Sequence, residues 1–282
     1  MVLSVPVFLG SSLSQFNNFI DKSLASSLQE GSVAALNYGH LLITLITGLT
    51  SSIIATIMYP KITKALNEGN WEFFNLAVEK AVIVVLLISV PFGMGAMAFA
   101  DEVVQVVYER GAFDTAATAL TGSAFFYYAI GLPFQAINAI LTHVYYSMRD
   151  MKTPIKCAAV GVIVNISMNL TLIESMQHKG LAFATSIAAI VNVLCLGLAI
   201  SKKHPHVKLL GSKRKVVKIV FVSALAVLAA LAFYKIIMDS IWLPRVIYLA
   251  LAILVACIVY MIVLLLFRID EVKVLLQVAK KR

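Results

Sequence analysis

The chain has 282 residues, of which 61% are hydrophobic and only 13% are charged, and its mean hydropathy is +0.92. Soluble domains carry about 25% charged residues. This composition therefore excludes a cytosolic enzyme, a disordered chain and a secreted disulfide scaffold. The three cysteines, Cys157, Cys195 and Cys257, lie in apolar runs without a CxxC pattern, which indicates small buried residues. We expect an integral membrane protein.

Eight stretches are apolar and long enough to cross a bilayer as helices, which requires about 20 residues each. Glycine, proline and charged residues separate these stretches. The predicted fold is an all-α polytopic membrane protein with eight transmembrane helices, arranged as a six-helix lobe and two extra helices. The predicted spans are 2–28, 33–60, 74–100, 116–147, 155–173, 180–200, 216–238 and 243–267.

The net charge of +9 is unevenly distributed along the chain. Seventeen of the 23 basic residues follow the second, fourth, sixth and eighth predicted spans, whereas the alternate loops hold only Arg110, Lys179 and Arg245. Cytoplasmic loops of membrane proteins are enriched in Lys and Arg. We therefore expect both termini to be cytoplasmic, and the charge indicates membrane topology and no nucleic-acid partner.

A basic run divides the chain into parts. We expect a transporter lobe at 1–200, a cytoplasmic loop at 201–215, a helix pair at 216–267 and an amphipathic cytoplasmic tail at 268–282. The run is typical of a positive-inside loop, and the alternative interpretation is a specific site for anionic lipid. The apolar residues of the tail recur at helical spacing and are flanked by cations, as in helices that lie on a membrane surface.

Polar residues recur along the first two predicted spans at steps of three and four, so they share one helix face. Polar groups in hydrocarbon are costly and usually face a cavity or another helix. We predict that this face lines a substrate path, and the alternative is pairing of the polar groups among themselves. The predicted substrate-cavity residues are Gln15, Asn18, Lys22, Asn37, His40 and Thr44.

A second set of polar residues offers oxygen ligands. Asp21, Asn165, Asn169 and Thr185 supply one carboxylate, two amides and a hydroxyl, which suit a small hard cation. We predict a sodium or proton coupling site there if the three spans meet. The sequence has no phosphate-binding loop and no HExxH or GxSxG motif, so we expect neither an enzyme nor a cofactor beyond that coupling ion.

Several motifs in order resemble the MurJ/MviN family of lipid II flippases. They include an ERGxF turn at Glu109–Phe113, a YxxxDxxTPxK segment from Tyr146 to Lys156, and a proline, Pro60, that closes the second span. Further matches occur at 20–39, 67–74 and 179–192. The resemblance covers almost the whole chain and weakens in the last two spans.

The resemblance implies a fold of fourteen helices, of which this chain would supply the second six-helix lobe and the final pair. It implies translocation of the undecaprenyl-linked peptidoglycan precursor across the bacterial inner membrane by alternating access of two lobes. The partners would be that precursor, membrane lipids and a first lobe, in cis or as a separate chain. The start at Met1, inside an apolar helix, leads us to expect that the first lobe is missing.

The resemblance also assigns residues. Asp21 with Asn165, Asn169 and Thr185 matches positions of the family's sodium site, and Lys22 matches a cation of its cavity. One departure is that the segment NYGHLL places His40 and Leu41 where the family has an Asp or Asn followed by a cavity arginine. The alternatives are therefore a flippase or exporter of another lipid-linked glycan or a drug, and an inactive half-transporter.

Overall fold

The computed structural model describes residues 4–209, 211, 213–240 and 244–267. Within these residues the chain is helical and contains no strand, which confirms the predicted all-α class. The elements are α1 Ser4–Ala25, α2 Ser32–Ile53, the π-helical turn η1 Ile54–Met58, α3 Tyr59–Asn67, α4 Trp71–Ala98, α5 Ala100–Tyr108, α6 Thr115–Ser147, α7 Lys152–Met176, α8 His178–Lys203, α9 Lys213–Ser240 and α10 Arg245–Leu266.

Seven helical segments in the described part of the chain are long and apolar enough to cross a membrane. They are the continuous segment from α2 to α3, then α4, α6, α7, α8, α9 and α10. The remaining long helix, α1, carries Gln15, Asn17, Asn18 and Asp21 within its 22 residues, and these polar side chains lower its hydropathy. The count of eight spans stays a prediction.

The second predicted span is longer than expected. We predicted that Pro60 closes it, but the chain stays helical through Pro60 as far as Asn67, so this detail was wrong. Pro60 lies near the start of α3 and has no backbone N–H, so one hydrogen bond to the preceding helical turn is missing there. The π-helical turn just before it widens the helix, and such turns are often found at functional sites.

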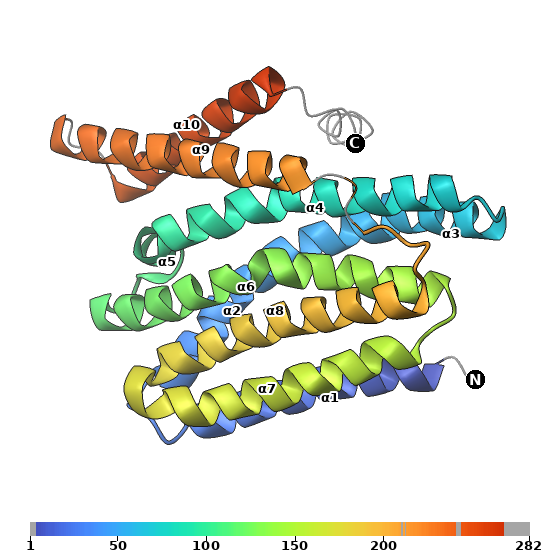
Figure 1. Cartoon of the computed structure of the whole chain (residues 1–282). Coiled ribbons are helices and arrows are strands. Elements are labelled where there is room, and N and C mark those ends of the chain that lie inside the picture. The colour runs from blue at the N-terminus through green and yellow to red at the C-terminus, as the bar shows by residue number, and fades with distance from the viewer. Residues whose placement is uncertain (1–3, 210, 212, 241–243, 268–282) are drawn as a thin grey trace.

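The helices pack in a layered order that starts from α6. This helix contacts α2, α4 and α8; α8 in turn contacts α7, and α7 contacts α1. Figure 1 shows the α9–α10 pair on the opposite side of α4 from α6. Residues 81–87 of α4 are all buried, because α4 is covered by α6 on one side and by α9 on the other.

The segment between α8 and α9 is tied to α4. The side chain of Asn75 donates to the carbonyl of His206 (2.8 Å) and accepts from the amide of Lys208 (2.9 Å). Because α8 ends at Lys203 and α9 begins at Lys213, this connection is shorter than the loop predicted at 201–215. The division into domains stays a prediction, and the tail predicted at 268–282 lies outside the described residues.

Candidate functional site

The four residues predicted to bind a cation lie together between three helices. Asp21 comes from α1, Asn165 and Asn169 from α7, and Thr185 from α8. Asn169 Nδ2 donates to Asp21 Oδ1 (2.6 Å) and to Asn165 Oδ1 (2.8 Å), and Thr185 Oγ1 donates to Asp21 Oδ2 (3.3 Å). Asp21, Asn165 and Asn169 are buried and Thr185 is half-buried.

The spacing of the residues explains how the cluster forms. Asn165 and Asn169 are four residues apart, so they stack on one face of α7, and α7 turns that face toward α1 and α8. Thr185 also donates to the carbonyl of Leu181 (3.1 Å), one turn earlier in α8. The cluster therefore joins α1 to two helices through buried polar contacts.

The structure adds a residue that we did not predict. With the Asn165 amide turned over, its nitrogen would donate to Asn17 Oδ1 and to Asp21 Oδ1, both at 3.0 Å. Asn17 therefore borders the same cluster, although we assigned its neighbour Asn18 to the polar face. The signal was in the sequence, because Asn17 and Asp21 are four residues apart and share a helix face.

One oxygen of the cluster is left without a partner. Asn169 Oδ1 is buried and accepts no hydrogen bond, while the nitrogen of the same amide is fully used. A buried polar atom without a partner is costly, and such atoms often mark an ion or water site. The donor set of one carboxylate and several neutral oxygens fits a monovalent hard cation, since it carries a single negative charge. No group of three His, Cys, Asp or Glu residues suited to a transition metal occurs in the described part of the chain.

The predicted cavity residues form a looser set on α1 and α2. Gln15, Lys22, Asn37 and Thr44 are exposed, and Asn18 and His40 are half-buried. Thr44 Oγ1 donates to the carbonyl of His40 (2.9 Å) and lies 3.4 Å from its Nδ1. Lys22 is close enough to His40 for their charges to interact, and the His40 ring meets Tyr128 edge to face with centroids 5.5 Å apart. Asn37 also lines a pocket of about 500 Å³ at the turn between α1 and α2. Their role as a substrate path stays a prediction.

The ERGxF turn is held by Glu109. Its carboxylate accepts hydrogen bonds from Gln105 Nε2 (3.0 Å) and Thr118 Oγ1 (2.8 Å), and it lies 3.8 Å from Arg245 of α10. The hydrogen bonds from Gln105 and Thr118 lower the pKa of Glu109. Gly111 follows with φ of +59°, a conformation that favours glycine. The turn therefore joins α5, α6 and α10.

The YxxxDxxTPxK segment forms a second polar junction, between α6, α7 and α8. Asp150 accepts from the Thr153 amide (3.0 Å) and hydroxyl (2.6 Å), and Lys203 Nζ lies 2.9 Å from its Oδ2. Partial burial opposes ionisation of Asp150, but these hydrogen bonds and the lysine charge outweigh it and lower its pKa to about 2. This junction fixes the end of α8 against the start of α7.

The profile of the lipid II flippase MurJ family matches residues 2–255, which is most of the chain. The chain belongs to the lipid II flippase MurJ family. The probable lipid II flippase MurJ of Rickettsia prowazekii is 31% identical over 199 residues, which cover 71% of this chain and 39% of that protein. The lipid II flippase MurJ of Burkholderia cenocepacia is 27% identical over 199 residues, with the same coverage. The chain thus spans less than half the length of these MurJ relatives.

Solved structures agree on the fold. A lipid II flippase MurJ in an inward closed conformation superimposes with a TM-score of 0.80 at 24% identity, over 95% of this chain and 54% of that one. A MATE transporter in a bent conformation superimposes with a TM-score of 0.62 at 17% identity, over 82% and 54%. The predicted MurJ and MATE-type architecture is therefore confirmed.

Proposed function

We propose that this chain forms one lobe and the additional helix pair of a lipid II flippase. The observation that carries the proposal is the match to the MurJ family over residues 2–255. The chain spans 39% of the Rickettsia relative, so the proposed activity requires a further six-helix lobe, in cis or as a separate chain. The pair of lobes would move the undecaprenyl-linked peptidoglycan precursor from the inner to the outer leaflet by alternating access.

The proposed location is the bacterial inner membrane with both termini on the cytoplasmic side. The support is the distribution of charge, since 17 of 23 basic residues lie at one end of the predicted spans and such residues are retained in the cytoplasm. Cysteine accessibility labelling in intact cells, at positions 67 and 112, would report opposite sides under this proposal.

The polar face of α1 and α2 is the proposed substrate path. A diphosphate is strongly solvated in water, so a low-dielectric path must offer cations and hydrogen-bond donors in exchange. Lys22 is the exposed cation on α1, and His40 supplies a second positive charge when it is protonated. Gln15, Asn18, Asn37 and Thr44 supply neutral hydrogen-bonding groups along the same two helices.

The cluster around Asp21 is the proposed coupling site for sodium or a proton. A carboxylate in a low-dielectric environment is stabilised by a counter-cation or by protonation. The oxygens of Asp21, Asn165, Asn169 and Thr185 would hold the ion, and the unpartnered Asn169 Oδ1 supports this proposal. A cation affects transport only through different affinities for the two lobe arrangements.

Two experiments test these proposals. This chain, expressed with a first lobe from a MurJ relative, should restore growth to bacteria depleted of their own flippase, and failure of a correctly inserted protein would count against it. Carbodiimide labelling of Asp21, read by peptide mass spectrometry, should decrease in sodium relative to potassium at fixed pH. Labelling that responds to pH but not to sodium would assign the proton instead.

A second candidate is export of another lipid-linked glycan or of a drug. The specific observation is that His40 and Leu41 stand where the family resemblance implies an Asp or Asn followed by an arginine, and the loss of that arginine reduces the positive charge available to a diphosphate. Drug resistance that depends on Asp21, without restored growth, would favour this candidate. An inactive half-transporter is favoured if neither Asp21→Asn nor Lys22→Ala changes any transport activity.

A further inference from the structure

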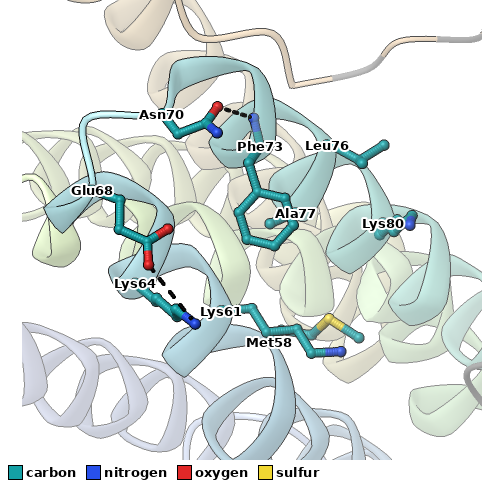
Figure 2. A pocket seen from close by; sticks show the side chains of 9 residues that line it. All are labelled: Met58, Lys61, Lys64, Glu68, Asn70, Phe73, Leu76, Ala77 and Lys80. Atoms are coloured by element: carbon teal, nitrogen blue, oxygen red, sulfur yellow. Dashed lines mark hydrogen bonds and ion pairs between the residues drawn. The ribbon is translucent and has the colours of Figure 1, made fainter.

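A pocket of about 490 Å³ opens between α3 and the start of α4, away from the Asp21 cluster. Figure 2 shows its side chains, which come from both helices, from the turn between them and from Met58 at the end of η1. Its apolar lining includes Phe73 and Leu76, which are both exposed. Its charged lining contains three lysines and one carboxylate: Lys61, Lys64, Lys80 and Glu68.

The local sequence explains why the lysines gather there. Lys61 and Lys64 are three residues apart and share a face of α3. The chain then reverses at Gly69, where φ is +67°, and Asn70 caps α4 by accepting from the Phe73 amide (2.9 Å). The tight turn places the first turns of α4, with Phe73, opposite the lysine face of α3.

The pocket has more positive than negative charge. Lys64 Nζ lies 3.8 Å from Glu68 Oε1, and the two side chains are 73% and 53% exposed, so this ion pair is weak. Lys61 and Lys80 form no ion pair with any carboxylate in the described part of the chain. Two ammonium groups are therefore available to an anion.

The length of the α2–α3 segment places the pocket near the membrane surface. Its 36 residues extend about 54 Å at 1.5 Å per residue, and about 41 Å along the membrane normal even at a 40° tilt. The hydrocarbon core is only about 30 Å thick, so one end of the segment must project beyond it. Trp71, exposed beside the pocket, is a residue type enriched at that interface.

We propose that this pocket binds the phosphate of an anionic phospholipid. The lysines would contact the headgroup phosphate, while Phe73 and Leu76 would contact the first carbons of the acyl chain. The basic segment between α8 and α9 is held nearby, because Asn75 binds it to α4 and the His206 ring lies 6.4 Å from that of Trp71. Its positive charge adds to the attraction for an anionic surface.

Quenching of Trp71 fluorescence by brominated lipid tests this proposal. The chain has two tryptophans, so Trp242→Phe leaves Trp71 as the single reporter. The protein is placed in phosphatidylcholine vesicles that contain a small fraction of either brominated phosphatidylglycerol or brominated phosphatidylcholine. We expect brominated phosphatidylglycerol to quench at several-fold lower mole fraction, since each lysine near an anionic surface strengthens binding about fivefold.

Matched variants separate a site from bulk charge. The variant K61Q/K64Q/K80Q should lose the preference for phosphatidylglycerol, and K61R/K64R/K80R should keep it. The control R149Q/K152Q/K156Q removes the same charge at the junction of α6 and α7 and should keep it too. Equal quenching by the two lipids, or equal loss in the control, would overturn the proposal. Loss of the preference on adding inorganic phosphate, but not chloride at equal ionic strength, would assign the pocket to free phosphate and overturn the lipid.

Discussion

The hydrogen bonds made by Asn169 should make it far more important for stability than a second asparagine, Asn192 of α8. Asn169 donates to the Asp21 carboxylate and to Asn165. Hydrogen bonds between transmembrane helices are worth about 0.6 kcal/mol on average and up to about 1.7 kcal/mol. The bond to Asp21 is short and charge-assisted, which places it near the upper value. We expect Asn169→Leu to lower the free energy of unfolding by about 2 kcal/mol.

Asn192 provides the matched control. Its side-chain oxygen is buried without a hydrogen-bond partner, so Asn192→Leu removes an unsatisfied polar group and should be neutral or stabilising. Thr185→Val is nearly isosteric and removes the hydroxyl that bonds Asp21 (3.3 Å) and Leu181 (3.1 Å) and accepts from Asn165 Nδ2 (3.3 Å). All three contacts are longer than the 2.6 Å bond of Asn169 to Asp21, so the effect should lie between the other two. This variant controls for a loss of stability caused only by the larger volume of leucine.

Reversible unfolding of the purified protein in mixed detergent micelles measures the three effects, with helicity followed by circular dichroism. The expected order of destabilisation is Asn169→Leu, then Thr185→Val, then Asn192→Leu. If Asn169→Leu and Asn192→Leu agree within about 0.5 kcal/mol, the polar cluster does not stabilise the packing of α1 against α7 and the reasoning fails.

Three further predictions test the packing of the helices and the junctions between them. Gly131→Ala should cost about 1–3 kcal/mol of unfolding free energy, because its Cβ would lie 2.9 Å from the Ser186 Cα, whereas Gly48→Ala, with nothing within 4 Å, should not. Asp150 should contribute about 1 kcal/mol to the free energy of unfolding after allowing for solvent screening. Because its pKa is lowered to about 2, this contribution is complete at neutral pH and should disappear as the pH falls from about 4 to 2. Asp150→Asn should flatten this part of the pH profile in the same unfolding assay. Asn75→Ala removes both bonds to the segment before α9, so trypsin should cleave that segment several-fold faster in a limited-proteolysis time course.

Apolar runs in the sequence were sufficient to predict an all-helical membrane protein, because the bilayer admits few other ways to satisfy a backbone. They were less informative where a helix is polar or irregular. The polar face of α1 leaves it outside the seven apolar candidates. The α2–α3 segment continues past Pro60, where the helix is irregular and contains the π-helical turn Ile54–Met58.

The cation cluster shows a different limit. Spacing alone places Asn165 and Asn169 on one face of a helix, but it does not say that this face meets Asp21. That contact depends on how α1, α7 and α8 pack, which involves residues 148 and 164 positions apart in sequence. Asn17 was missed because Asn17 and Asn18 are adjacent, and the sequence does not show which of them faces the neighbouring helices. Only the packing shows that Asn17 lies toward α7.

The contacts that hold α1 indicate how an ion bound at the proposed coupling site would move this helix. Figure 1 shows α1 at the edge of the helical layers beside α7, and its contacts with α2 and α8 are few. Two polar bonds of Asp21, to Asn169 and to Thr185, join α1 to α7 and α8. An ion bound to the Asp21 carboxylate would replace the hydrogen bonds of Asp21 to Asn169 and Thr185. It would stabilise the position of α1 in which more oxygens coordinate it. Because Lys22 is the next residue along the same helix, any such movement of α1 also moves the exposed cation of the proposed substrate path.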